Sequence, residues 1–203
     1  MIVGLLLAAG GARRFGSQKL VATLSDAPLV RHAATMLAGV TDELIVVVGS
    51  DAEAVTHALD GVDARIVKNT QWERGLSGSI HCGVAAIPTA ASAMLIALGD
   101  EPGVSADVSR SVITAWRSTD RPIVVPRYAG VAGHPVLFAA SIFAELAALD
   151  GDVGAKRVIN RSAERVAYVD VNEAPPLDVD EPADLQRIER KNDDATKRPA
   201  SGG

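Results

Sequence analysis

Residues 2–19 read IVGLLLAAGGARRFGSQK, an apolar run that passes directly into a basic loop punctuated by glycines. The run from Ile2 to Leu7 lacks the polar residue at every second position that marks a strand with one solvated face. Continuous apolar runs are typical of strands covered on both faces in mostly parallel sheets. The stretch therefore predicts a first core strand, followed by a loop at the carboxyl edge of a sheet.

The same pattern continues outward along the chain. Apolar, β-branched runs alternate with helix-like segments, which is the signature of an α/β domain with a mostly parallel central sheet. The expected strands cover 2–7, 44–48, 64–67, 93–98, 122–126 and 166–171, and the expected helices cover 28–38, 51–59, 79–87, 106–117, 139–149 and 181–191. Asp51 and Ser105 stand at helix starts, where their side chains would cap free N–H groups. Short strand-to-helix loops should thus form one ligand-binding edge.

Length and composition limit the class of protein. A chain of 203 residues with 48% hydrophobic content can build one good core, so we expect one domain over 1–190 and a polar, disordered tail over 191–203. No apolar run approaches the roughly 20 residues that cross a bilayer. The N-terminus lacks a signal-peptide pattern, and a single cysteine, Cys82, cannot form an internal disulfide. These features predict a cytoplasmic protein without a membrane partner.

Charge is distributed unevenly. A formal net charge of −5 argues against a nucleic-acid-binding surface, but Arg13, Arg14 and Lys19 gather in the glycine-rich loop. Backbone amides around Gly10 and Gly11 can form an anion-binding concavity, to which the basic side chains add formal charge. The loop therefore favours a small polyphosphate ligand, with an ordinary glycine-rich connection as the alternative. It is neither a Walker A loop nor a G-x-G-x-x-G loop.

Two acidic segments complete the candidate site. Asp100 follows the expected strand 93–98, and Asp180 precedes the last expected helix. Mg²⁺ is held in proteins by a few carboxylates together with water and substrate phosphates, so this pair would suffice if the two segments converge. Asp178 is the alternative to Asp180. Both segments could also be simple helix-initiating turns, where acidic residues are favourable.

Several segments together resemble the MobA-like NTP transferase family, and within it the molybdenum cofactor cytidylyltransferase branch. The resemblance rests on LAAGGARRFGSQKL at 7–20, GLSGSIHCG at 75–83, LGDEP at 98–102, GHPVLF at 133–138, GDVGAK at 151–156 and DVDEPADL at 178–185. These motifs occur in the family's order and span nearly the whole chain. The resemblance implies a Rossmann-like, three-layer nucleotidyltransferase fold. It also implies transfer of an NMP group to an acceptor phosphate with loss of pyrophosphate.

The resemblance also implies roles for individual residues. Arg14, Lys19 and Asp100 would be catalytic, and Asp100 with Asp180 would hold Mg²⁺ as cofactor. Nucleotide binding would fall to Leu7, Ala8, Ala9, Gly10, Gly11, Arg14, Lys19, Gly75, Ser77 and Ser79. The acceptor side would be shaped by Gly133, His134, Pro135, Gly151, Asp152 and Gly154.

Substrate identity rests on fewer residues. Ala9 favours CTP over GTP, because guanylyltransferases of this family usually have Gly there. The expected acceptor is the phosphate of the molybdenum cofactor, a molybdopterin, and a molybdoenzyme or its chaperone would be a transient partner. Ala12 and Glu101 depart from the family pattern, which usually has Ser and, in the cytidylyltransferase branch, Gln. A different acceptor such as a sugar phosphate, with guanylyl or cytidylyl transfer, and an inactive nucleotide- or cofactor-binding delivery protein remain the alternatives.

Overall fold

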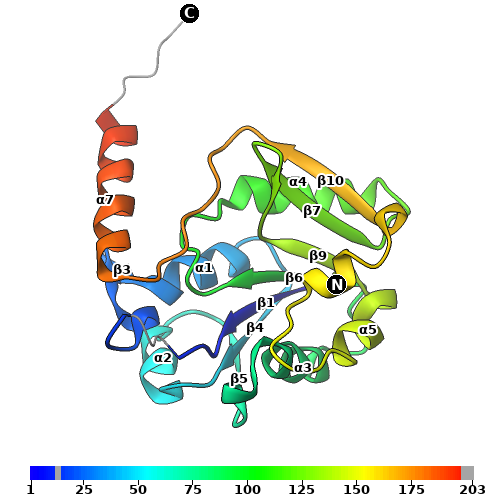
Figure 1. Ribbon diagram of the computed structural model, residues 1–203, viewed down its shortest axis with the longest axis horizontal. Helices are drawn as coiled ribbons and strands as arrows, with labels where there is room; N and C mark the ends of the chain where they lie inside the picture. The colour runs from blue at the N-terminus through cyan, green and yellow to red at the C-terminus, as the bar shows by residue number, and fades with distance from the viewer. Residues whose placement is uncertain (12–14, 198–203) are drawn as a thin grey trace, which may run out of the picture.

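The computed structural model describes the backbone of residues 1–11 and 15–197 and the side chains of 1–11 and 15–190. Its centre is an eight-stranded sheet in the order β10-β7-β9-β6-β1-β4-β5, with β8 paired to β7 (Figure 1). The sheet is formed by β1 (Ile2–Ala8), β4 (Glu43–Val48), β5 (Arg65–Lys68), β6 (Ala93–Leu98), β7 (Ile123–Tyr128), β8 (Val131–Ala132), β9 (Val136–Ala139) and β10 (Val166–Val171). A small separate ladder joins β2 (Thr23–Leu24) to β3 (Ala27–Pro28). The predicted α/β class is confirmed.

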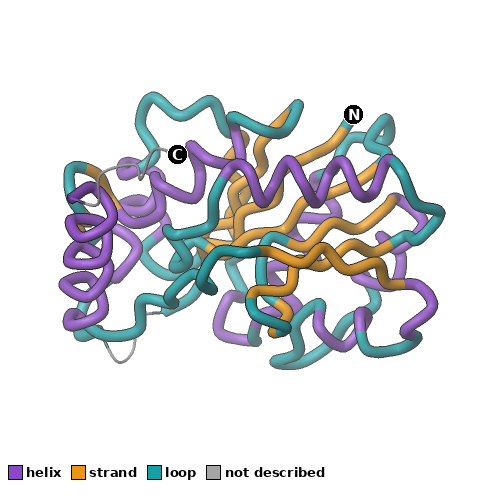
Figure 2. The backbone as a smooth tube through the Cα atoms, turned by 90° about the horizontal axis from the view of Figure 1, so that it is seen from above, coloured by secondary structure: helices purple, strands orange, loops and turns teal. Residues whose placement is uncertain are grey.

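Helices cover both faces of this sheet, so that the molecule has three layers (Figure 2). The α-helices are α1 (Leu29–Ala38), α2 (Ala52–Ala58), α3 (Leu76–Ala86), α4 (Ala106–Arg117), α5 (Phe143–Ala147), α6 (Lys156–Ile159) and α7 (Pro182–Lys197). Short 3₁₀ turns are η1 (Lys19–Val21), η2 (Trp72–Arg74), η3 (Ala140–Ile142) and η4 (Ala163–Arg165). Within residues 1–11 and 15–197, no helix is both long enough and apolar enough to cross a membrane.

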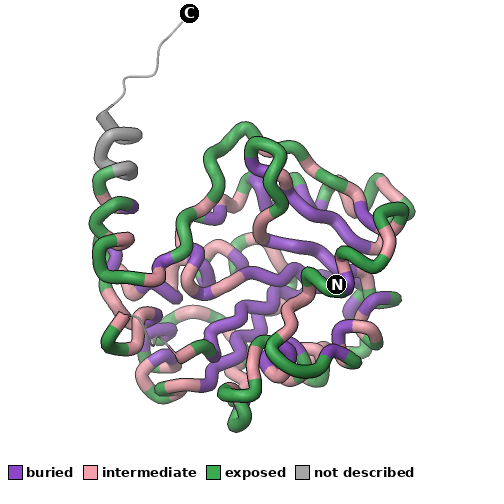
Figure 3. Tube along the Cα trace, viewed as in Figure 1, coloured by how far each residue is buried: buried purple, intermediate pink, exposed green. Residues whose placement is uncertain are grey.

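The continuous apolar runs reflect two separate cores, one on each face of the sheet. Leu6 of β1 belongs to the core packed under α1 and α4, whereas its neighbour Leu5 belongs to the core packed under α3 and α5. Strand residues alternate between the two faces, so every residue of β1 is buried (Figure 3). This double burial explains why the strands lack polar alternation.

This half of the sheet consists of β6, β1, β4 and β5 in that order, and all three neighbouring pairs are parallel. β9 differs, since it lies antiparallel between β6 and β7. We did not predict β9 as a strand. Its four residues follow Pro135 and carry no local signal of their partners, because its pairing is made with strands far away in the sequence. The insertion nevertheless brings the GHPV segment beside the carboxyl end of β6.

Several helix ends differ from the prediction, and the expected helix 139–149 is instead η3 followed by α5, which ends at Ala147. α3 begins at Leu76, three residues before its expected start, and α7 continues to Lys197, so residues 191–197 of the expected tail are helical. Ser105 caps α4 as predicted, since its Oγ accepts a hydrogen bond from Val108 N at 3.2 Å. Asp51 precedes α2, but within the described residues its side chain makes no capping hydrogen bond, and its φ of 52° is left-handed.

Candidate active site

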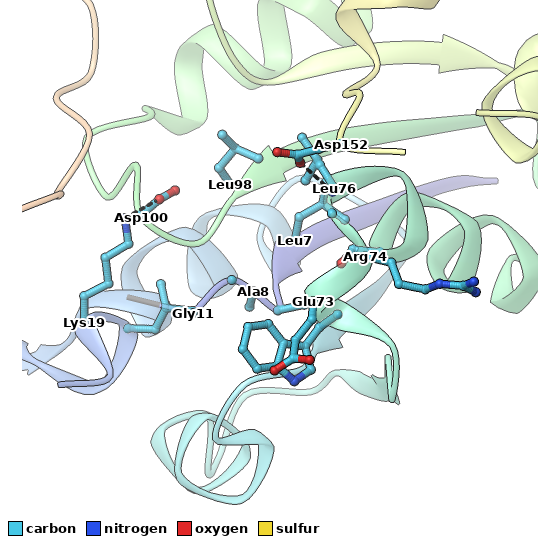
Figure 4. Close-up of a pocket in the computed structure, with 16 residues that line it drawn as sticks. Leu7, Ala8, Gly11, Lys19, Glu73, Arg74, Leu76, Leu98, Asp100 and Asp152 are labelled. Atoms are coloured by element: carbon cyan, nitrogen blue, oxygen red, sulfur yellow. Dashed lines mark hydrogen bonds and ion pairs between the residues drawn. The ribbon is translucent and has the colours of Figure 1, made fainter. Parts of the chain in front are cut away.

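A cavity of about 450 Å³ opens at the carboxyl ends of β1 and β6 (Figure 4). Residues from the first loop, from η2 and from the start of α3 surround it. Its lining is Leu7, Ala8, Ala9, Gly10, Gly11, Lys19, Leu20, Trp72, Glu73, Arg74, Gly75, Leu76, Ser79, Leu98, Asp100 and Asp152. The structure therefore brings most of the predicted nucleotide-binding residues to one space. Arg14, predicted to hold phosphate, lies outside the described residues.

Lys19 joins the two acidic segments. Its Nζ lies 2.7 Å from Asp100 Oδ2 and 3.1 Å from Asp180 Oδ1. The backbone reinforces this meeting, because Val179 N donates to the carbonyl oxygen of Asp100 at 3.0 Å. Burial lowers the pKa of Lys19, but the hydrogen bonds and charges of the two carboxylates outweigh it and raise the pKa. Lys19 is thus held as a cation between two anions drawn from positions 80 residues apart.

The chemistry of these side chains suits a hard divalent cation. Carboxylate oxygens of Asp100 and Asp180 converge on one point, which Lys19 Nζ marks, and such oxygens are preferred by Mg²⁺. Within the described part of the chain, no group of three or more His, Cys, Asp or Glu side chains could hold a metal. The pair therefore fits a cation that takes its other oxygens from water and substrate. The alternative ligand, Asp178, lies nearer to Glu101: burial, and then the charge of Glu101, raise the pKa of Asp178 to about 6.

Trp72 shapes the cavity beside the glycine-rich loop. A Cβ added at Gly11 would lie 2.8 Å from Trp72 Cζ3, and one added at Gly49 would lie 2.6 Å from Trp72 Cβ. The indole therefore packs against two backbones that have no side chain. Trp72 also lines the cavity. The neighbouring Glu73 and Arg74 were missed, because a 3₁₀ turn leaves no periodic signal.

The segment after α5 docks on the start of α3. Asp152 Oδ1 accepts a hydrogen bond from Leu76 N at 3.2 Å, and Ser77 Oγ donates to the carbonyl oxygen of Gly151. Gly75 makes this possible: its φ is 106°, and a Cβ there would lie 2.7 Å from Asp152 Cα. Asp152, predicted for the acceptor side, thus lines the same cavity as the residues predicted to bind the nucleotide.

The serines of α3 are placed differently from each other. Ser79 lines the first cavity and accepts a hydrogen bond from Asn69 Nδ2 at 3.2 Å. Ser77, with Gly151, instead lines a separate cavity between α3 and the segment that follows α5. The hydroxyl of Ser77 is engaged by the chain itself, which fits a role in positioning α3.

A second cavity of about 430 Å³ adjoins the first and is mainly apolar. Leu7, Leu76 and Leu98 line both cavities. Three residues predicted for the acceptor side also line this one: Gly133, His134 and Gly154. The remaining predicted residue, Pro135, immediately precedes β9 and follows a cis peptide bond. The predicted acceptor residues are therefore divided among three cavities.

Glu101 was noted in the sequence only as a departure from the family pattern. In the structure its carboxylate is buried and pairs with His134 Nδ1 at 2.9 Å and 3.1 Å. Burial lowers the pKa of His134, but Glu101 outweighs it and raises the pKa. Tyr128 Oη donates to the carbonyl oxygen of His134 at 2.7 Å. These contacts pin the loop before β9 to the loop after β6, a long-range link with no local signal.

Comparison with known proteins agrees with this arrangement. Residues 4–166 match the MobA-like NTP transferase domain. A curated relative, nicotine blue oxidoreductase of Paenarthrobacter nicotinovorans, is 32% identical over 201 residues, covering 92% of this chain and 96% of the relative. The match thus extends over almost the full length of both proteins.

Solved structures show the same fold. A homologue of Mycobacterium tuberculosis Rv0371c from Mycobacterium sp. strain JC1 superposes with a TM-score of 0.85 at 30% identity, covering 96% of this chain and 98% of that one. Rv0371c of M. tuberculosis H37Rv, solved in complex with manganese, gives a TM-score of 0.78 at 31% identity, covering 93% and 98%. The motifs quoted from the sequence and the topology therefore point to the same relatives.

Proposed function

Because the chain belongs to the MobA-like NTP transferase family, and is thus a MobA-like nucleotidyltransferase, we propose that it transfers CMP from CTP to the phosphate of a molybdopterin cofactor. The observation that carries the proposal is the convergence of Lys19, Asp100 and Asp180 beside the glycine-rich loop. A cation and two carboxylates at the edge of a nucleotide-sized cavity suit phosphoryl chemistry.

The proposed reaction requires little covalent chemistry from the protein. An oxygen of the acceptor phosphate attacks the α-phosphorus of CTP, the bond from that phosphorus to the bridging oxygen breaks, and pyrophosphate leaves. Two anions must approach each other, so catalysis depends on positioning and charge neutralisation. An acceptor phosphate is already ionised near neutral pH, so no strong general base is needed. Lys19 is placed to neutralise phosphate charge, and Arg14 is its proposed companion.

Asp100 and Asp180 are the proposed holders of a divalent cation, which we take to be Mg²⁺. When bound, such a cation neutralises and orients the triphosphate. The manganese complex of Rv0371c, 31% identical to this chain, supports a divalent-cation site in the family. Lys19 would then exchange at least part of its pairing with the two carboxylates for pairing with phosphate.

Base preference is proposed from Ala9. Ala9 lies at the floor of the cavity and is only 4% exposed. A Cβ added at Gly49 would lie 2.8 Å from the Cβ of Ala9. The floor is therefore filled at this point, which supports the smaller pyrimidine base. The acceptor is proposed to enter from the apolar cavity, since the two spaces share three leucines.

A second candidate function is oxidoreduction. It is favoured by the relative from Paenarthrobacter nicotinovorans, which is named an oxidoreductase and is 32% identical, together with an apolar cavity beside the nucleotide cavity. Hydride transfer from a reduced nicotinamide cofactor would need the same two spaces. The absence of a G-x-G-x-x-G loop in the sequence favours the transferase.

The decisive experiment measures pyrophosphate release by the purified protein with Mg²⁺. CTP and GTP are compared, each with molybdopterin cofactor, with a sugar phosphate, or with no acceptor. We expect pyrophosphate release only in the reaction that contains both CTP and the molybdopterin cofactor. Release with the sugar phosphate would replace the acceptor, nucleotide binding without release would favour a delivery protein, and oxidation of reduced nicotinamide in a parallel assay would favour the second candidate.

The metal assignment has its own test. Asp100→Ala should lower Mg²⁺-dependent turnover by at least about 100-fold, the loss typical for removing one transition-state stabiliser. Its fold should survive, because Asp100 is partly exposed and lies after the strand. The matched control is Asp107→Ala, an exposed carboxylate of α4 that pairs only with Arg110 among its described neighbours. Full activity in the Asp100 variant would contradict the assignment.

A further inference from the structure

Exposed apolar side chains gather at one place on this molecule. In the described part of the chain, five large hydrophobic residues are exposed, and three of them line the apolar cavity. Val131 is 66% exposed, Tyr168 46% and Leu76 37%. Exposed apolar side chains that cluster around a cavity are typical of ligand-binding sites. The cluster therefore calls for an apolar occupant.

The cavity lies on the face of the sheet that carries the α3 and α5 core. Val125, Val136 and Phe138 supply its base from β7 and β9. Among its described lining residues, Lys156 is the only Lys, Arg, Asp or Glu, and His134 is the only histidine. Asn160 adds an amide. No carboxylate is found among these lining residues, so the site suits a largely uncharged body with a few polar atoms at its edge.

Tyr168 packs against a neighbouring side chain on the sheet. The Arg127 guanidinium lies over its ring, with Cζ 4.8 Å from the ring centroid. Asp170 fixes that guanidinium through two hydrogen bonds, from Nε at 2.9 Å and from Nη2 at 3.0 Å. One face of the phenol ring is thus covered by a cation that is itself immobilised. An aromatic side chain held in this way loses little conformational entropy when a ligand stacks on it.

The cavity adjoins the proposed nucleotide site. Leu7, Leu76 and Leu98 line both, and α3 presents Leu76 at the boundary between them. The close approach of Leu76 to the opposite wall depends on Gly154, where an added Cβ would lie 2.9 Å from Leu76 Cδ2. A ligand that fills the apolar cavity therefore reaches toward the phosphate-binding edge.

We propose that Tyr168 is a stacking shelf for a flat, uncharged aromatic or heteroaromatic ring system, which is the body of the acceptor. The identification of this ligand as the acceptor rests on the proposed function. The volume of about 430 Å³ accommodates a ring system of two or three fused rings. A sugar phosphate is disfavoured, since its hydroxyls would face aliphatic side chains without partners.

The test is direct binding, measured by isothermal titration calorimetry on the full chain. The probes are 6-hydroxymethylpterin, riboflavin and glucose 1-phosphate, with CTP titrated separately. The variants are Tyr168→Ala, Tyr168→Phe and Val131→Ser, and the control is Leu177→Ala, which removes a side chain of similar exposure, 41%, from another surface. Thermal melting of each variant checks that it folds. We expect little change in Tm, because Tyr168 and Val131 are exposed and contribute little to the core.

We expect at least one ring probe to bind, and Tyr168→Ala to weaken it by about fivefold or more, the usual loss when a stacking ring is removed. Tyr168→Phe should retain the affinity, Val131→Ser should reduce it, and Leu177→Ala should leave it unchanged. CTP affinity should be the same in all variants. A ring probe that binds Tyr168→Ala as well as the parent chain, or tighter binding of glucose 1-phosphate, would overturn the shelf.

The two proposals can fail separately. Absence of pyrophosphate release with every acceptor, together with a ring probe whose affinity depends on Tyr168, would remove the proposed function and keep the shelf. Suppose instead that pyrophosphate is released with the cofactor, while ring-probe affinity and the acceptor KM are the same in Tyr168→Ala as in the parent chain. That result would support the proposed function and contradict the stacking role of Tyr168.

Discussion

At the scale of single residues, the site is organised around the counter-ion that the chain itself provides. Lys19 neutralises Asp100 and Asp180, which would otherwise repel each other across a partly buried space. All three residues were predicted from their motifs. The pairing itself was not, since nothing local in the sequence reveals that segments 80 residues apart share one cation.

Lys19→Met should separate the two roles of this residue. Turnover should fall at least about 100-fold, because the phosphate loses a charge partner. Affinity for Mn²⁺ without nucleotide should rise several-fold, because the cation no longer competes with an ammonium for two carboxylates. Calorimetric titration with MnCl₂ measures the second effect, and Lys68→Met, an exposed lysine at the end of β5, is the control. Equal or weaker Mn²⁺ affinity in Lys19→Met would contradict this account.

At the scale of elements, the sequence predicted regular structure better than the contacts between elements. All six expected strands are present. β1, β4, β6 and β7 are buried on both faces and therefore appear as continuous apolar runs, whereas β5 and β10 are partly exposed. β9 was missed, because a four-residue antiparallel insertion has no period of its own. The early start of α3 was missed for a related reason: Gly75 and Asp152 set it through a contact across the chain.

Gly75→Ala should destabilise the start of α3 for two reasons. Its φ of 106° is unfavourable for alanine, and its Cβ would meet Asp152. Gly61→Ala isolates the first reason, since its φ is 85° but nothing described lies within 4 Å of its Cβ. We expect Gly61→Ala to cost about 1 kcal/mol and Gly75→Ala to cost more. Urea unfolding measures both; weaker CTP binding should accompany the Gly75 variant alone, and equal effects would argue against the contact.

Glu145 links α5 to the segment before β10. Hydrogen bonds from Arg165 and then Arg161 lower the pKa of Glu145 from its usual 4.5. A lowered pKa in the folded state stabilises the protein above the unfolded-state value, and this contribution is lost as pH falls through the folded-state pKa. Glu145→Gln should therefore lower stability at pH 7 by less than about 1 kcal/mol, since the pair is partly exposed.

Thermal melting from pH 7 down to pH 3 measures this effect. The difference in Tm between Glu145→Gln and the parent chain should shrink as the solution becomes more acidic than the usual glutamate pKa of 4.5. A gap that stays constant across this range would show that charge on Glu145 is not its source.

At the scale of the whole molecule, one edge of a three-layer sheet collects loops from the entire chain. The loop after β1, the loop after β6 and the segment before α7 meet at Lys19, and the loop before β9 joins them through Glu101. That edge was predictable, because parallel strands present their carboxyl ends together. The division into two cavities was not, since it depends on where β9 inserts.

Glu101 should affect the acceptor more than the nucleotide. Glu101→Leu removes the partner of His134 and frees the loop before β9, so acceptor KM should rise about tenfold while KM for CTP changes little. Glu101→Gln keeps a hydrogen-bond acceptor and should restore most of the loss. Steady-state kinetics with each substrate varied in turn measure the split, and equal rises in both KM values would indicate a general disturbance instead.

Leu7, Leu76 and Leu98 form a partition between the two cavities. Any occupant of one cavity presses on the same three side chains that an occupant of the other must touch. Filling one side therefore sets the shape that the second substrate meets, and thermodynamic linkage requires the effect to be mutual. If the proposed reaction is correct, the affinity of CTP is expected to depend on whether the acceptor is bound, and the affinity of the acceptor to depend equally on CTP.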